Sequence, residues 1–83
     1  MQPAAPLRVA VITTFYPPCN FGGDGRYVQS FVHSLARRGC DVEVIYDADA
    51  WRVGKGIARS VDLPSPEPEP AGVTVHRLQS RWP

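Results

Sequence analysis

Apolar residues recur along the chain with two different periods, and the change between them separates strands from a helix. The run Val9-Ala10-Val11-Ile12 within residues 7–14 predicts a strand that is buried on both faces of a parallel sheet. Residues 41–46 form a short run that is rich in β-branched side chains and predicts a second strand. Residues 73–78 predict a third. Between the first two strands, apolar residues follow helical spacing over residues 27–35.

The predicted helix has a start, a buried face and an end. Asp24 is the candidate N-cap, because a carboxylate at that position accepts a hydrogen bond from the first turn. Gly39 follows the last turn and suits the left-handed conformation of the C′ position. His33 projects opposite the apolar face, so we expect it at the solvent-exposed surface. The expected apolar face consists of Tyr27, Val28, Phe31, Val32 and Leu35.

A glycine-rich turn, residues 17–28, joins the first strand to this helix. Pro17 and Pro18 end the strand, since proline cannot donate to a sheet ladder. Gly22 and Gly23 precede the helix, whose first N–H groups have no intrahelical partner and attract an anion. In α/β folds ligands bind at such turns. The alternative is that these glycines serve only a tight turn and helix packing.

The glycine spacing matches neither of the two common phosphate-binding loops. A dinucleotide fingerprint, G-x-G-x-x-G, needs a third glycine where Val28 stands. A P-loop needs Gly-Lys-Ser/Thr, which does not follow. Cys19 and Cys40 form no CxxC or zinc pattern, and the predicted helix holds them too far apart for a disulfide. His76, in the third predicted strand, has no partner in sequence that suggests metal ligation or acid–base work.

The part of the chain after the second strand is first basic and then rich in proline. Residues 50–60 carry Trp51, three cations and no acidic residue. They predict a solvated loop or short helix whose tryptophan covers the sheet edge, or else a basic surface for an acidic ligand or lipid headgroups. Residues 63–71 predict an extended, solvated, proline-rich spacer, and residues 1–6 a flexible leader.

Composition excludes several classes of protein. The chain has 83 residues, a net charge of +1 and 43% hydrophobic residues, which is typical of a soluble globular chain of one domain or less. With so little net charge and no run of like charge, it is not expected to bind nucleic acid. No stretch approaches the roughly 20 apolar residues of a membrane span, and no signal peptide is visible. We therefore expect a cytoplasmic protein.

The order strand, helix, strand, loop, strand predicts an α/β fold. It is a partial Rossmann-like parallel sheet, the opening half of a doubly wound sheet. One helix covers only one face, whereas the first strand favours cover on both, and parallel sheets are seldom left open. A chain of this size buries too little surface to compensate. Residues 7–83 are therefore interpreted as an incomplete domain, and the chain as a fragment.

Seven short motifs occur in an order and spacing that resemble one enzyme family. They are Arg8-Val9-Ala10-Val11-Ile12, Phe15-Tyr16-Pro17-Pro18, Gly22-Gly23, Tyr27-Val28, Leu35-Ala36-Arg37-Arg38-Gly39, Asp41-Val42-Glu43-Val44 and Gly72-Val73-Thr74-Val75-His76-Arg77-Leu78. Together they resemble the N-terminal part of glycosyltransferase family 4, whose members are retaining enzymes with the GT-B fold. The resemblance covers nearly the whole chain apart from the leader and residues 51–70.

In that family two Rossmann-like domains face each other across a cleft, and a nucleotide-activated sugar binds mainly to the C-terminal domain. The resemblance implies that Gly22 and Gly23 place backbone N–H groups near the donor diphosphate, with Asn20 and Asp24 as acceptor contacts. Gly25, at the start of the helix, departs from the common pattern. The resemblance also implies that the catalytic residues lie beyond the chain, that no metal or cofactor is held, and that the nucleotide sugar is a substrate.

We therefore expect a fragment, inactive alone, of a glycosyltransferase that moves a sugar from a nucleotide sugar to an unknown acceptor, with peripheral membrane contact as an option. One alternative is the N-terminal part of a nucleotide-cofactor oxidoreductase or epimerase, in which Asp47 or Asp49 would hold a ribose hydroxyl. The glycine spacing argues against it. Another alternative is a non-catalytic interaction module built on the open sheet and the proline run.

Overall fold

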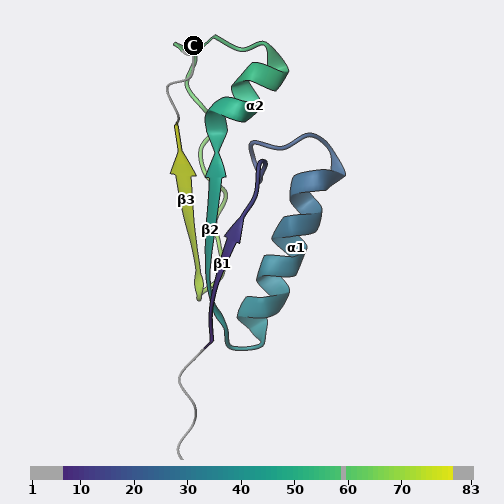
Figure 1. Ribbon diagram of the computed structural model, residues 1–83, viewed down its shortest axis with the longest axis vertical. Helices are drawn as coiled ribbons and strands as arrows, with labels where there is room; N and C mark the ends of the chain where they lie inside the picture. The colour runs from purple at the N-terminus through teal and green to yellow at the C-terminus, as the bar shows by residue number, and fades with distance from the viewer. Residues whose placement is uncertain (1–6, 59, 80–83) are drawn as a thin grey trace, which may run out of the picture.

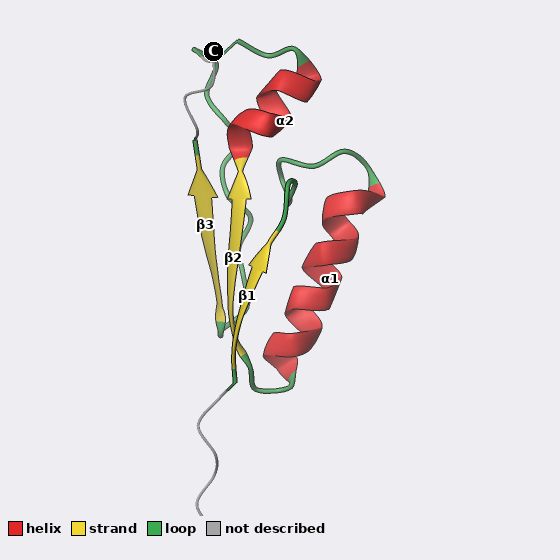
Figure 2. Cartoon of the chain, in the orientation of Figure 1, coloured by secondary structure: helices red, strands yellow, loops and turns green. Residues whose placement is uncertain are grey.

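Three parallel strands and two helices make up the part of the chain that the computed structural model describes, residues 7–58 and 60–79 (Figure 1). The elements are β1 (Arg8–Ile12), α1 (Gly23–Arg37), β2 (Asp41–Asp47), α2 (Ala48–Lys55) and β3 (Val73–Leu78). The strands form one sheet in the order β1-β2-β3, and both neighbouring pairs are parallel (Figure 2). The expected α/β fold with a partial Rossmann-like sheet is confirmed. The expected leader, residues 1–6, lies outside the described residues.

The core lies between one face of the sheet and α1. Strand register aligns Val9 with Val42 and Val42 with Val73, so that alternate residues of all three strands face α1. In β2 the residues of this set, Val42, Val44 and Tyr46, are almost completely buried. Apolar side chains of α1 and the loops pack on them, as the amphipathic pattern of the helix requires.

The opposite face of the sheet is open. Ile12 is 80% exposed and Leu78 is 51% exposed. Because the strand order advances in one direction, right-handed crossovers place α1 and the β2–β3 connection on the same face. No described residue forms a layer on the other face. The prediction that the first strand is buried on both faces is therefore wrong for this chain, although the prediction that one helix leaves a face uncovered is confirmed.

The start of α1 differs from the prediction. The helix begins at Gly23, its N-cap is Gly22, and the cap makes no side-chain hydrogen bond. Asp24 is therefore not the N-cap but a residue of the first turn, and its carboxylate accepts hydrogen bonds from the N–H groups of Phe21 and Gly25. At the other end Arg38 is the C-cap, and Gly39 follows with a φ of 92°, which confirms its predicted role.

Two other expectations for α1 are wrong. Tyr27 and Phe31 are 79% and 54% exposed, since the row that meets the sheet runs through Val28, Val32 and Leu35 and leaves both aromatic rings on the flank. His33 is only partly exposed. Its Nε2 lies 2.6 Å from the Oε2 of Glu69, because the chain before β3 returns along the helix.

The segment after β2 forms a short helix, one of the two structures expected there. The Asp47 side chain caps α2 by accepting from the N–H of Asp49 at 2.9 Å, and Gly56 ends the helix in the left-handed conformation. Trp51 is buried in the core cluster. Within the described ranges, no helix has the length and apolar character needed to cross a membrane.

Candidate functional site

The predicted site, the loop between β1 and α1, lies at the carboxyl end of the parallel sheet. Figure 1 shows this loop and α2 together at the end to which the strand arrows point. The loop is anchored by a two-residue bridge: the N–H of Cys19 donates to the carbonyl of Tyr16 at 2.8 Å, and the reverse bond measures 3.3 Å. Both residues are fully buried. The glycine turn therefore begins at a backbone position that this bridge holds in place.

Asn20 holds the loop in place through one hydrogen bond with α2 and one within the loop. Its carbonyl accepts from the indole N–H of Trp51 at 3.3 Å, and its side-chain amide donates to the carbonyl of Gly22 at 2.8 Å. The ring of Phe21 packs edge-on against Phe15, with 5.0 Å between centroids. Asn20, expected as an acceptor contact, thus already uses its side-chain N–H₂ group within the loop.

The three glycines of this turn have different structural reasons. Gly22 has φ 59° and ψ −128°, a conformation that is essentially restricted to glycine. A Cβ on Gly23 would meet no atom within 4 Å, so this glycine faces open space. A Cβ on Gly25 would lie only 2.4 Å from the Cβ of Asn20. Gly25, which sequence reasoning treated as a departure from a pattern, is the packing glycine.

The charges around the loop are mixed. The N-terminus of α1 offers its positive dipole end, but the carboxylate of Asp24 already binds two loop N–H groups there. A cation comes from α2: the ammonium of Lys55 lies 5.7 Å from the ring centroid of Phe21 and 5.6 Å from that of Trp51. The sequence showed Lys55 only as part of a basic segment. Its position beside Phe21 depends on where α2 begins.

Arg52 does not contribute to the basic surface that was one of the two alternatives for this segment. Arg52 is buried, its Nη1 lies 3.3 Å from the Oδ1 of Asp49, and its Nη2 donates to the carbonyl of Val61 at 2.7 Å. Arg59 lies outside the described residues. Asp49 is therefore held by an ion pair, and Asp47 by its capping role, which counts against either of them holding a ribose.

A second polar environment lies in the core just below the loop. The Tyr46 hydroxyl accepts from the Nε of Arg77 at 2.7 Å, and burial raises the pKa of Tyr46. Tyr16 packs beside it, with ring centroids 6.0 Å apart, and its buried hydroxyl has no hydrogen-bond partner in the described part of the chain. Burial, followed by the nearby Glu69 carboxylate, raises the pKa of Tyr16.

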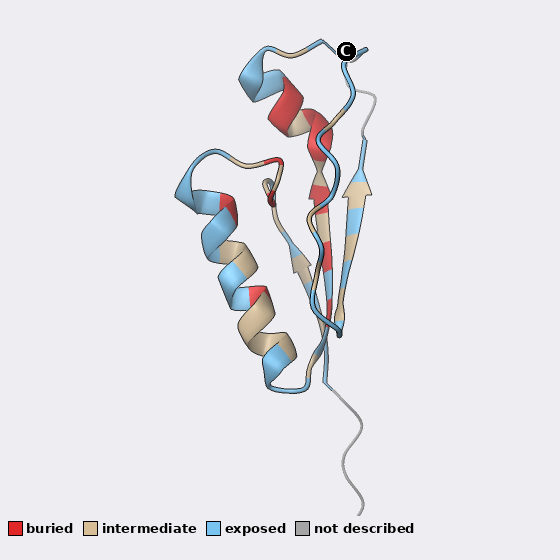
Figure 3. Ribbon diagram, turned by 180° about the vertical axis from the view of Figure 1, so that it is seen from behind, coloured by how far each residue is buried: buried red, intermediate tan, exposed pale blue. Residues whose placement is uncertain are grey.

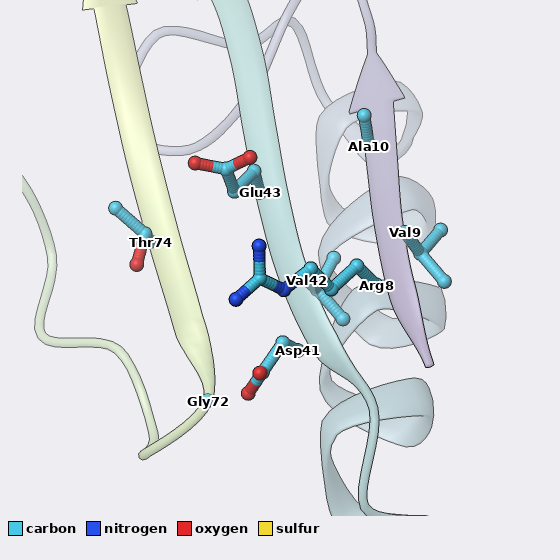
Figure 4. A pocket seen from close by; sticks show the side chains of 8 residues that line it. All are labelled: Arg8, Val9, Ala10, Asp41, Val42, Glu43, Gly72 and Thr74. Atoms are coloured by element: carbon cyan, nitrogen blue, oxygen red, sulfur yellow. The ribbon is translucent and has the colours of Figure 1, made fainter. Parts of the chain in front are cut away.

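A shallow hollow of about 390 Å³ lies elsewhere, on the open face near the amino ends of the strands (Figure 4). Figure 4 shows the Arg8 side chain reaching across β2 toward the carboxylates of Asp41 and Glu43. His76, further along this face, lies 3.2 Å from Glu43. Since ligands of open parallel sheets bind at the carboxyl ends of the strands, the glycine loop remains the candidate site.

Metal binding and thiol chemistry receive no support from the geometry. Across residues 7–58 and 60–79, no group of three or more histidine, cysteine or acidic side chains is placed to hold a metal ion. Cys19 is buried and Cys40 half-buried, and both thiols are free.

No protein-family model matches the chain, and a search of the curated proteins finds no match. Function is therefore inferred from the geometry of the loop.

Proposed function

We propose that this chain is the N-terminal part of a glycosyltransferase, and that the loop between β1 and α1 receives the diphosphate of a nucleotide sugar. The observation that carries the proposal is the open backbone of Gly22 and Gly23 at the N-terminus of α1, at the carboxyl end of a parallel sheet. The ammonium of Lys55 lies over the ring of the preceding residue, Phe21. The helix N-terminus supplies positive potential at a backbone that has no side chain in front of it, and the Lys55 ammonium adds a cation on the neighbouring helix α2.

Each part of the loop has a physical role in the proposal. The open space at Gly23 lets a phosphate oxygen approach the N–H groups of Gly23 and Asp24 within hydrogen-bonding distance, whereas the N–H of Gly25 already donates to the Asp24 carboxylate. The conformation of Gly22 orients that turn, and Asn20 stabilises it. Asp24, on the surface of the first turn, is the proposed acceptor contact. The sugar-transfer chemistry itself is assigned to residues of the parent protein beyond this chain, in the cytoplasm.

The proposal is tested by titrating the ¹⁵N-labelled chain with UDP, GDP and inorganic pyrophosphate while following backbone amides by NMR. We expect the largest shifts at Gly22, Gly23 and Gly25. Gly23→Ala should weaken binding roughly tenfold to a hundredfold, because a methyl group displaces a charge-assisted hydrogen bond. The matched control is Ser30→Ala on the exposed side of α1.

Three results bear on the proposal in different ways. Loss of binding in Gly23→Ala with a melting temperature equal to or above that of the parent chain supports the anion site. Equal binding by Gly23→Ala and the parent sequence contradicts it. In the complete protein, the same substitution should lower kcat/KM for the nucleotide sugar while leaving the folded fraction unchanged.

A non-catalytic interaction module is the second candidate, since one face of the sheet is uncovered and carries Ile12 and Leu78 at high exposure. This candidate predicts no amide shifts at the glycine loop with any of the three phosphate ligands.

A further inference from the structure

The proline-rich connection to β3 is attached to α1 by its acidic side chains. We call residues 63–70 the strap and the side chains of Arg26, Gln29 and His33 the α1 row. Arg26 donates two parallel bonds of 2.8 Å to the carboxylate of Glu67, and Gln29 adds a bond of 3.3 Å to the same group. The Nε2 of His33 lies 2.6 Å from Glu69. The strap is largely exposed, as its composition predicts, but its two glutamates attach it to α1.

The backbone of the strap contributes little to this attachment. Four of its eight residues are prolines, which have no N–H to donate. Among the described residues, the only backbone-to-backbone bond of the strap is a turn at its end, where the N–H of Val73 donates to the carbonyl of Pro70 at 3.2 Å. Figure 3 shows the strap running along the strands as an irregular coil rather than a strand. Removing it would break few hydrogen bonds apart from those of the α1 row.

The α1 row is arranged to recognise carboxylates on an extended chain. Alternate residues of an extended chain point to the same side, and the intervening prolines hold the strap in that conformation. Glu67 and Glu69 therefore both face α1, and the planar guanidinium of Arg26 fits the first carboxylate with two parallel bonds. Hydrogen bonding to Arg26 lowers the pKa of Glu67, so this carboxylate stays charged.

An independent observation lies beneath the strap. The hydroxyl of Tyr16 is completely buried and unpartnered among the described residues, next to the Glu69 carboxylate. A buried hydroxyl without a partner is unusual and needs a reason. After burial, the Glu69 carboxylate is the next cause that raises the pKa of Tyr16, so the strap already places an acidic group close to this hydroxyl.

We propose that the α1 row is a docking surface for extended acidic peptides with proline between the carboxylates, and that the strap is its resident intramolecular ligand. A tethered segment has an effective concentration of about 1 mM or more at its own site. The strap therefore blocks the surface against weak competitors, and a partner gains access when the strap is released. This proposal does not depend on the glycosyltransferase assignment.

The test uses the chain with Glu67→Gln and Glu69→Gln together, and a synthetic peptide with the sequence of residues 63–70. We expect the peptide to shift the α1 amides of this double variant with a dissociation constant on the order of 1 mM. The parent chain should bind at least about twofold more weakly, because a strap whose effective concentration is close to or above this dissociation constant occupies the row at least about half of the time. Adding Arg26→Gln to the double variant should abolish binding.

Two controls separate recognition from general charge effects. Glu43→Gln removes an exposed carboxylate from the open face, and it should leave the parent's weak binding unchanged. A peptide with glutamine in place of both glutamates should not bind. If the double variant fails to fold, the two peptides are compared on the parent chain at 10 mM. In either background, equal shifts with both peptides, or none with the acidic one, would overturn the proposal.

Discussion

Three glycines within four residues at the start of α1 should respond differently to alanine. Gly22→Ala forces a side chain into a conformation reserved for glycine, at about 1–3 kcal/mol. Gly23→Ala meets open space and gains up to about 1 kcal/mol of helix propensity. Gly25→Ala places a Cβ 2.4 Å from the Cβ of Asn20. Overpacking costs up to about 3 kcal/mol, and about 1 kcal/mol of propensity offsets it, which leaves a net loss of roughly 2 kcal/mol.

The collision at Gly25 cannot relax easily, because Asn20 is fixed on both sides, by its bond to Gly22 and by the bond it accepts from Trp51. Urea denaturation followed by circular dichroism at 222 nm measures the three variants against the parent chain. A loss of 2 kcal/mol corresponds to a fall in Tm of about 8–16 °C for a chain of this size. If Gly25→Ala is as stable as the parent, or Gly23→Ala is the least stable of the three, the packing argument is refuted.

Three further predictions concern the core, the open face and the strap. Arg52→Leu should lower the unfolding free energy by roughly 3–5 kcal/mol in urea denaturation, because it leaves Asp49 buried and unpaired. Val44→Ala should cost roughly 2 kcal/mol in the same assay, whereas Ile12→Thr on the open face should change stability by less than about 0.5 kcal/mol. The pKa of Glu67 is lowered in the folded chain, so its contribution is present at neutral pH and is lost as the pH falls through that lowered pKa. An NMR pH titration of the Glu67 side chain should show this midpoint below that of the unfolded chain, and an equal midpoint would contradict it.

The elements that could be predicted are those whose signals are local. The apolar runs at 41–46 and 73–78 and the helical spacing after the glycine turn each coincide with an observed element. The first strand was predicted over residues 7–14, which is longer than the observed β1. Its burial was also predicted wrongly, because a continuous apolar run indicates a strand but does not show how many of its faces are covered. Whether a face of a strand is covered depends on the strand order and on the direction of the crossovers. The sequence of a single segment determines neither of them.

The contacts that escaped prediction join residues far apart in the sequence. His33 and Glu69 meet because the strap returns along α1, and Lys55 reaches Phe21 because Asp47 starts α2 directly after β2. The one available signal for the strap was the alternation of glutamate with proline, which predicts an extended chain but not its partner. In the same way, Gly25 is recognisable as the packing glycine only once the position of Asn20 is known.

Asp24 provides the sharpest test of the proposed diphosphate site, because its carboxylate lies where an anion would bind. Asp24→Asn keeps an oxygen acceptor for the N–H groups of Phe21 and Gly25, and it removes one negative charge. Two unit charges about 4 Å apart in water interact by about 1 kcal/mol, so pyrophosphate should bind the variant roughly fivefold more tightly at low salt. The gain should shrink as salt screens the pair. If Asp24 also contacts the acceptor, the complete protein with this substitution should use the acceptor less efficiently while the donor binds more tightly. Unchanged pyrophosphate affinity at low ionic strength would mean that the phosphate does not bind at the first turn of α1.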